Sequence, residues 1–175
     1  MILKSITTSD ILELQKIYIK AYSSVFSNHW VENGMEQYLA KEADYMGLKS
    51  DIESLEHLFY FIQHNKTNVG FIKLNNTVQD SPIASDQDIS ELEKIYMLPE
   101  YSGKGIGKEA MKELIGLVKE LGKRHFFLSV VESNDDAIAF YKKLGFEFHS
   151  KTHIDEPGFK EELRGMDRMI LKLRE

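Results

Sequence analysis

The sequence predicts an α/β fold, with a mixed central sheet of about six or seven strands layered by about four helices. Strand-like runs dominate the middle of the chain, and helical patterns interrupt them on both sides of a glycine-rich segment. The length of 175 residues is typical of one domain, so we expect a single domain over residues 1–175. Hydrophobic residues make up 42% of the chain, which is enough to form a core.

The N-terminal half is expected to contain two helices before its first pair of strands. A short strand over Met1–Ile6 leads to a helix that is capped within Thr8–Asp10. Its apolar positions recur at helical spacing and are Ile11, Leu14, Ile17, Tyr18 and Ala21. A second helix is expected over Glu32–Ala43, followed by a hairpin of the strands Leu58–His64 and Asn68–Leu74.

The C-terminal half has the sharper pattern. Asn75–Asp88 is rich in Asn, Asp and Ser, which predicts a loop, and Ile89–Leu98 then predicts a strand that stops at Pro99. The remaining expected elements are the helix Gly105–Leu121, the strand His125–Val131, the helix Asn134–Leu144 and the strands Phe146–Lys151 and Met166–Leu173.

Charge and composition exclude several classes of function. The formal net charge of −6 repels polyanions, so we expect no nucleic-acid partner and a preference for cationic small molecules. The absence of cysteine excludes disulfides and an acyl-cysteine intermediate. The N-terminal segment Met1–Ile6 is too short and too polar to be a signal peptide. The longest apolar run, Leu58–Ile62, is far shorter than the ~20 residues that a membrane helix needs. We therefore expect a cytoplasmic protein without a membrane partner.

The segment Pro99–Lys108 carries three glycines at alternate positions between an expected strand and an expected helix. Such a loop lets the backbone approach a ligand, and the free amides and the dipole of the helix favour a phosphate there. Its spacing fits neither a P-loop nor a dinucleotide fingerprint. The alternative is a turn that only lets the helix pack against the sheet. The residues expected at the phosphate are Ser102, Gly103, Lys104, Gly105, Ile106, Gly107 and Lys108.

The glycine loop Pro99–Lys108 and the segment Asn134–Phe146 together resemble the GNAT superfamily of N-acetyltransferases. The glycine loop is similar to the family pattern (Arg/Gln)-x-x-Gly-x-(Gly/Ala), with Gly105 and Gly107 at the glycine positions and Ser102 where the family has Arg or Gln. Asn134–Phe146 looks like the second family motif, N-x-x-A-x-x-F-Y-x-x-x-G-F. Together the two motifs span Glu91–Phe146.

A closer likeness links the chain to PaiA-like spermidine/spermine N-acetyltransferases within this superfamily. It rests on the runs Glu91–Tyr96 and Ala137–Lys143 and on the length of the chain. The first seventy residues are similar only loosely.

The resemblance implies a GNAT fold and acetyl-CoA as the cofactor, lying between the strands Ile89–Leu98 and His125–Val131. Besides the glycine loop, the residues implied to hold it are Ile95, Tyr96, Met97, Asn134 and Lys143. Asn134 also suits the N-cap of the following helix, and that role alone would explain its identity.

Two catalytic roles follow from the resemblance and from the chemistry of amines. Tyr141 is implied to protonate the departing thiolate; the alternative is a core tyrosine on an amphipathic helix. A base must remove the proton of an ammonium acceptor. Glu91 and Glu93 are candidates because alternate residues of a strand share a face, with Glu93 nearer the acetyl site. Ordinary strand-surface carboxylates are the alternative.

The acceptor is expected to be a primary amine of a polyamine such as spermidine or spermine. Tyr22 and Trp30 lie near the join of the first two helices, where GNAT enzymes line the acceptor channel, and with Glu91 they are the expected acceptor-binding residues; core packing is the alternative. Other readings are a protein N-terminus, an amino acid or an aminoglycoside as acceptor, or a non-catalytic acetyl-CoA sensor. The scattered histidines form no metal motif, so no metal site is expected, and the resemblance allows a homodimer.

Overall fold

The computed structural model describes residues 2–78, 83 and 88–173. Its strands are β1 (Leu3–Ser5), β2 (His57–His64), β3 (Thr67–Asn75), β4 (Ile89–Met97), β5 (His125–Val131), β6 (Glu147–His153) and β7 (Gly165–Lys172). Its α-helices are α1 (Ile11–Phe26), α2 (Gly34–Glu42), α3 (Tyr45–Glu53), α4 (Ile106–Glu120) and α5 (Asp135–Lys143).

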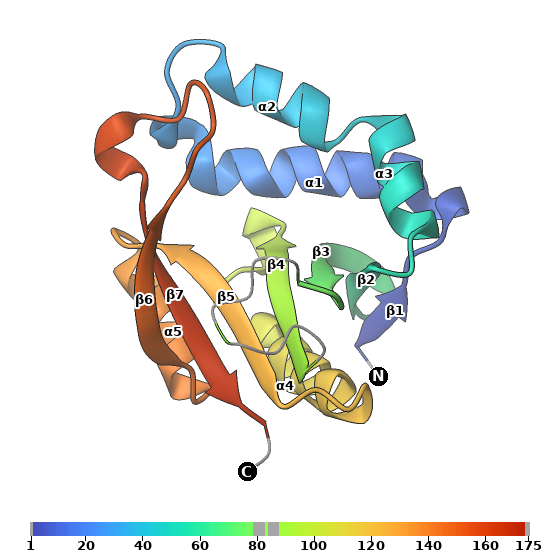
Figure 1. Cartoon of the computed structure of the whole chain (residues 1–175). Coiled ribbons are helices and arrows are strands. Elements are labelled where there is room, and N and C mark those ends of the chain that lie inside the picture. Colours follow the sequence, from blue (N-terminus) through green and yellow to red (C-terminus); the bar gives the residue numbers. More distant parts are fainter. Residues whose placement is uncertain (1, 79–82, 84–87, 174–175) are drawn as a thin grey trace.

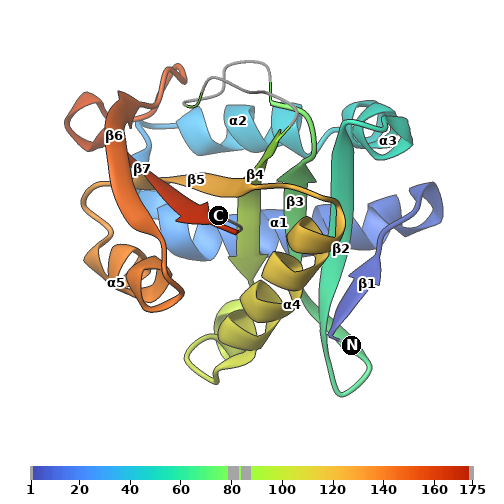
Figure 2. The same cartoon turned by 60° about the horizontal axis from the view of Figure 1, so that its bottom comes forward.

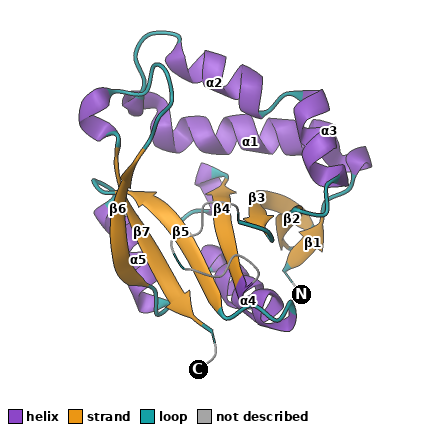
Figure 3. Cartoon of the chain, viewed as in Figure 1, coloured by secondary structure: helices purple, strands orange, loops and turns teal. Residues whose placement is uncertain are grey.

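The seven strands form one mixed sheet in the order β1-β2-β3-β4-β5-β7-β6. β4 and β5 pair in parallel, and every other neighbouring pair is antiparallel. Figures 1 and 3 show α1, α2 and α3 over one face of the sheet, and Figure 2 turns α4 on the other face toward the viewer. The predicted α/β fold and its mixed sheet are confirmed. No helix in the described ranges is long and apolar enough to cross a membrane.

Helix α3 is the element that the sequence did not predict, and it makes five α-helices among the described residues instead of about four. The side chain of Asp44 caps it by accepting a hydrogen bond from the Gly47 amide at 2.9 Å. Only Leu48 of this helix is buried, and a glycine stands in its first turn, so its apolar pattern is too weak to predict a helix.

Several predicted boundaries differ slightly from the structure. β1 begins at Leu3, α2 covers a shorter range than Glu32–Ala43, and β6 extends to His153. Most of the expected loop Asn75–Asp88 lies outside the described residues.

Two hydrophobic cores lie on opposite faces of the sheet. On one face α1, α2 and α3 pack on β2 and β3, with Tyr18, Phe61 and Phe71 fully buried. On the other face the apolar stripe of α4, including Met111 and Leu114, packs on the middle strands. The sheet is thus covered on both sides, as a mixed sheet with a parallel pair requires.

The parallel pair β4–β5 is short and then opens. Its register runs from Ile89 opposite His125 to Leu92 opposite Leu128, and no pairing follows beyond that point among the described residues. β4 continues along β3 as far as Met97, and β5 continues along β7 as far as Val131. The two strands therefore diverge, as Figure 1 shows at the end of β4 that faces α1.

Gly70 allows the close approach of β3 to the diverging part of β4. A Cβ atom at this position would lie 2.5 Å from the Tyr96 carbonyl oxygen and 3.1 Å from the Cα of Met97. We expect Gly70→Ala to lower the free energy of unfolding by about 2 kcal/mol, because the two strands must move apart.

The matched control is Gly116→Ala in α4, where a Cβ atom would meet nothing within 4 Å. Since alanine favours the helix, this change should raise the free energy of unfolding by about 0.5–1 kcal/mol. Urea denaturation of both variants measures the difference. Equal effects of the two substitutions would contradict the close contact at Gly70.

Candidate active site

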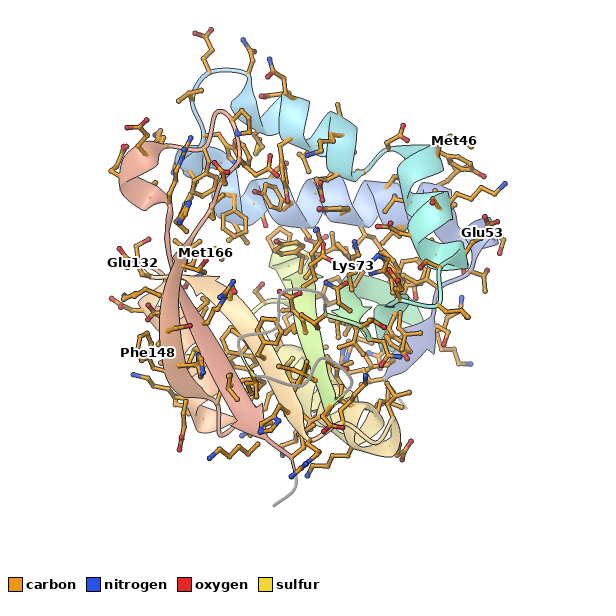
Figure 4. The ribbon with its side chains drawn as sticks, viewed as in Figure 1. Met46, Glu53, Lys73, Glu132, Phe148 and Met166 are labelled. Carbon is orange, nitrogen blue, oxygen red and sulfur yellow. The ribbon has the colours of Figure 1, made fainter. Side chains whose placement is uncertain are left out.

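A pocket of about 380 Å³ opens where β4 and β5 diverge. The side chains of Leu128 and Tyr141 lie at one part of it, and those of Tyr22 and Trp30 at another. Met166 on β7 also lines it, and Figure 4 labels this residue beside the divergence of the strands. The pocket therefore joins the sheet, both helical layers and the β6–β7 loop.

The edge of β4 that faces the pocket carries free main-chain donors. The Leu98 amide donates to the Val69 carbonyl at 2.9 Å, on the β3 side. Because amide directions alternate along a strand, the amides of Ile95 and Met97 point to the other side, from which β5 has diverged. These two amides are available to a ligand in the pocket, whereas that of Tyr96 points to β3.

The glycine loop between β4 and α4 has main-chain amides that are open to a ligand. Gly103 and Gly105 have φ values of 74° and 80°, in the left-handed region that favours glycine. A Cβ atom at either position would meet nothing within 4 Å, so both face open space. The amides of residues 103–107 find no acceptor in the described part of the chain. They surround the start of a 15-residue helix, where the dipole favours an anion.

The lysines of this loop are both exposed. Lys104 places its ammonium 5.3 Å from the centre of the Tyr101 ring, and Lys108 lies in the first turn of α4. Ser102 lines the pocket at the end of the turn that follows β4. The loop thus adjoins the pocket and offers positive charge to a phosphate.

Helix α5 presents two polar residues to the pocket. The side chain of Asn134 caps the helix by accepting the amide of Ala137 at 3.1 Å, and the residue also lines the pocket. Tyr141 is 9% exposed, and its hydroxyl has no hydrogen-bond partner among the described residues. Burial raises the pKa of Tyr141 to about 12, so its phenol stays protonated at neutral pH.

Glu93 lines the pocket, but two buried lysines hold its carboxylate. Lys94 donates to one oxygen, and Lys73 lies 3.0 Å from the other. Burial alone would raise the pKa of Glu93, but the two ammonium groups outweigh it and lower the pKa to about 2. Such a carboxylate is a weak base. This environment argues against the role of general base that the sequence indicated for Glu93.

The ion pairs continue away from the pocket. Lys73, labelled in Figure 4, also donates to Asp51 of α3 at 2.8 Å, and Lys94 lies 3.2 Å from Glu42 of α2. Burial alone would lower the pKa of Lys94, but Glu93 and the neighbouring tyrosines and Glu42 raise it. Lys94 is therefore fully charged at neutral pH.

Glu91 is placed differently from Glu93. It accepts a hydrogen bond from the Asn75 side chain at 2.9 Å and does not line the pocket. Burial raises the pKa of Glu91, and the hydrogen bond from Asn75 offsets part of that rise. Its carboxylate is a stronger base than that of Glu93, but the structure does not bring it to the pocket wall.

The part of the pocket under α1 and α2 is aromatic. Tyr22 lies 5.1 Å from Tyr38 and 5.4 Å from Tyr96, measured between ring centres, and Trp30 lies 4.8 Å from Tyr38. All four rings line the pocket. The two residues expected at the acceptor, Tyr22 and Trp30, thus lie on the pocket wall and also pack in the core beneath α1.

Residues 12–146, about three quarters of the chain, match the model of the acetyltransferase (GNAT) family. The chain belongs to this family. The match confirms the family that the two sequence motifs indicated, a family of enzymes that use acetyl-CoA.

Individual relatives agree with the GNAT assignment. An uncharacterized N-acetyltransferase of Methanocaldococcus jannaschii is 26% identical over 98% of this chain and 66% of that protein, so the chain spans slightly less than two thirds of that relative. A spermidine N(1)-acetyltransferase of Thermoplasma acidophilum is 27% identical over 72% of this chain and 73% of that protein. The crystal structure of a PaiA N-acetyltransferase of Thermoplasma acidophilum in complex with coenzyme A covers 97% of each chain with a TM-score of 0.76 and 22% identity.

The structure brings most of the GNAT residues that the sequence indicated to one place. The pocket wall includes Ile95, Tyr96, Met97, Ser102, Asn134, Tyr141, Glu93, Tyr22 and Trp30. The remaining loop residues from Gly103 to Lys108 adjoin it without forming part of that wall. Lys143 is exposed in the last turn of α5 and does not line the pocket, and neither does Glu91.

Sequence reasoning missed several residues of this GNAT pocket. Lys94, Tyr38, Glu156 and Phe159 line it, and Lys73 supports it through Glu93. A signal was present for Lys73, which stands between Ile72 and Leu74 in an apolar run of β3 and must therefore have a buried partner. No pattern in the neighbouring sequence indicates Glu156 or Phe159. Both reach the pocket because the β6–β7 loop folds back toward it.

The ion pairs of Glu93 should make stability depend on pH. The folded pKa of Glu93 is about 2, below its ordinary value of 4.5. The stabilisation that the ionised Glu93 adds to the free energy of unfolding is therefore fully present above about pH 4.5 and is lost as the pH falls through about 2. We expect Glu93→Gln to lower the free energy of unfolding by about 3 kcal/mol near neutral pH, because two buried lysines lose a partner.

The difference between wild type and this variant should shrink as the pH is lowered from about 5 to 3, measured by denaturant unfolding at each pH. Glu53→Gln is the control, since this side chain is exposed on α3 and labelled in Figure 4. It should change stability little at any pH. A difference for Glu93→Gln that does not vary with pH would contradict the ion-paired carboxylate.

Proposed function

We propose that this chain transfers an acetyl group from acetyl-CoA to a primary amine of a polyamine. The observation that carries the proposal is one continuous pocket with two chemically different ends. One end has the free amides of β4 beside the glycine loop, and the other has the aromatic wall under α1 and α2. Tyr141 lines the same pocket.

The glycine loop and the open edge of β4 fit the chemical groups of acetyl-CoA. The open space at Gly103 and Gly105 admits a pyrophosphate to the unpaired amides of residues 103–107. The open edge of β4 offers Ile95 and Met97 as donors to an arm that carries amides, as a further strand would. Asn134 and Ser102 line the same pocket.

The chain's own residues would supply three contributions to the reaction. Bound acetyl-CoA supplies the acetyl group as a reactive thioester. The Met97 amide would hold the carbonyl oxygen, and the loss of one such donor typically costs ~10²–10³ in rate. Tyr141 would hold a proton beside the sulfur, and the surrounding apolar side chains would exclude water.

The pKa of Tyr141 limits how it can act. Its pKa of about 12 exceeds that of a thiol, ordinarily about 8.5, so complete proton transfer to a thiolate is uphill by about 5 kcal/mol. Tyr141 therefore acts by donating a hydrogen bond to the sulfur while charge develops there. The CoA thiolate would then take its proton from solvent as the product leaves, and Tyr141 would keep its own.

The acceptor must reach the pocket as a neutral amine. An alkyl ammonium has a pKa of about 10.4, so about one molecule in a thousand is neutral at pH 7.4. Because Glu93 is held ionised by its lysines, we assign it to positioning Lys94 and Lys73 rather than to proton removal. The acceptor's proton would then pass to solvent at the mouth of the pocket.

Three observations support a polyamine as the acceptor. The Thermoplasma acidophilum relative is named for spermidine. The net charge of −6 attracts cations. The aromatic wall of Tyr22, Trp30 and Tyr38 suits an alkyl chain that carries ammonium groups.

Release of CoA from acetyl-CoA with a panel of amines tests the proposed reaction. The panel contains spermidine, spermine, putrescine, lysine, an aminoglycoside and a short peptide. We expect release with the polyamines and little with the other amines. Release only with lysine, the aminoglycoside or the peptide would keep the acetyl transfer and reject the polyamine. Tight binding of acetyl-CoA without release with any amine would favour a sensor of acetyl-CoA.

Replacement of Tyr141 tests the catalytic assignment. We expect Tyr141→Phe to lower kcat by about 10²-fold or more and to leave acetyl-CoA affinity nearly unchanged, because the variant loses only a proton donor. Steady-state kinetics and calorimetry measure the two effects. Tyr60→Phe, which removes a phenol from β2 outside the pocket, is the matched control and should retain kcat. A near-normal kcat for Tyr141→Phe would reject the assignment.

A further inference from the structure

We propose that the aromatic end of the pocket binds a second cationic group of the acceptor, with Glu156 as its counter-ion. The site would select acceptors that carry two or more amino groups over monoamines. This inference rests on the proposed acetyl transfer to amines, and it assigns a role to residues on the β6–β7 loop that the catalytic steps do not use.

Aromatic rings form the wall of this site. Trp30 lies between Tyr38 and Phe159, with ring centres 4.8 Å and 5.0 Å away, and is itself 6% exposed. All three residues line the pocket together with Glu156. Faces of Trp and Tyr rings attract ammonium groups, and they do so more strongly where water is excluded.

The β6–β7 loop is fixed over the pocket by bonds to the loop that follows α1. Trp30 and Phe159 form an isolated β-bridge, and the amide of Val31 donates to the carbonyl of Gly158 at 2.9 Å. A Cβ atom at Gly34 would lie 2.9 Å from the same carbonyl, so the two segments are in close contact. The wall is therefore assembled from two segments that are far apart in sequence.

Within the β6–β7 loop, a single side chain holds the backbone around Glu156. Arg164 donates from its Nε to the Phe159 carbonyl at 3.1 Å and from its Nη2 to the Glu156 carbonyl at 3.2 Å. The position of Glu156 relative to the rings is thereby set before any ligand arrives. A site fixed in this way loses little entropy on binding.

The two carboxylates that line the pocket, Glu93 and Glu156, differ in their cationic partners. Glu93 is matched by Lys73 and Lys94, both within 3.0 Å. Among the described residues, Glu156 is paired with the exposed ammonium of Lys41 alone, at 3.7 Å, and its side chain is 32% exposed. Of the two carboxylates, Glu156 is therefore the one that can pair with a cationic ligand.

Glu156 also acts on the rings beside it. Burial chiefly raises the pKa of Tyr38, and the carboxylate of Glu156 adds to that rise. The charge of Glu156 thus reaches Tyr38 of the aromatic wall, where the ammonium of Lys94 acts in the opposite direction. An ammonium placed between this carboxylate and the rings would gain both an ion pair and a cation–π contact.

The consequence for specificity is a difference between diamines and monoamines of equal chain length. While one amino group of the acceptor reacts near Tyr141, a second could be held at Glu156. A monoamine lacks that second group and gains nothing from the carboxylate. The matched pair 1,4-diaminobutane and butylamine isolates this difference, with spermidine as a longer acceptor.

The kinetic test compares Glu156→Gln with Glu162→Gln, which makes the same change at an exposed residue of the same loop outside the pocket. We expect the ratio of kcat/KM for 1,4-diaminobutane to that for butylamine to fall about tenfold in Glu156→Gln. The same fall is expected for spermidine, and Glu162→Gln should keep the wild-type ratio. An unchanged ratio in Glu156→Gln would overturn the inference.

Trp30 is the only tryptophan of the chain, so its fluorescence reports binding at this site without acetyl transfer. Titration with spermidine should change the emission of the wild type, with an affinity about tenfold weaker in Glu156→Gln and unchanged in Glu162→Gln. If no amine is acetylated but this Glu156-dependent binding persists, the proposed reaction fails and the cation site stands. If amines are acetylated but the affinity is the same in both variants, the cation site fails and the reaction stands.

Discussion

The loss of pairing between β4 and β5 after Leu92 and Leu128 is the constraint on which the rest of the structure depends. In a continuous sheet the amides of Ile95 and Met97 would be used by the neighbouring strand, and no pocket would exist. Backbone donors that are buried without partners are costly, so an open edge inside a sheet is tolerated only where a ligand or water can pair with it. The divergence therefore both creates the cavity and requires an occupant that carries hydrogen-bond acceptors.

The second feature of the site is the group of charges on β3 and β4 beneath the helical layer. Lys73 and Lys94 are 9% and 8% exposed, and each is paired with carboxylates from two different elements. The register of β3 and β4 shifts at this place, so Glu93 is the extra residue of a bulge. A bulge beside a site re-aims side chains, and here it places Glu93 between the two lysines. The same pairing that makes the charges tolerable in the interior deprives Glu93 of basicity.

The sequence predicts the parts of the molecule whose signals are local. The stripe of α4, the cap Asn134 of α5 and the glycines that require a left-handed backbone at 103 and 105 are all determined by neighbouring residues. The family motifs depend on the same short-range patterns. This is why the fold, the family and most of the pocket wall could be predicted.

Other features depend on residues distant in sequence and could not be predicted. The carboxylates at positions 91 and 93 look equivalent along the strand, but burial leaves the pKa of Glu91 raised, whereas at Glu93 the ammonium groups of Lys94 and Lys73 outweigh burial and lower the pKa. The aromatic wall needs Phe159 to meet Trp30 across more than half of the chain. Helix α3 was missed for a third reason, since one glycine and few apolar residues hide a segment that tertiary packing makes helical.

Amide hydrogen exchange with and without CoA tests the central claim most directly, because it reads the main-chain donors themselves. If the open edge of β4 and the glycine loop hold the cofactor, saturating CoA should slow exchange at Ile95, at Met97 and across residues 103–107. The amide of Tyr96, which points to β3, should change less. CoA binding that leaves these amides unchanged and protects a different part of the chain would contradict the account.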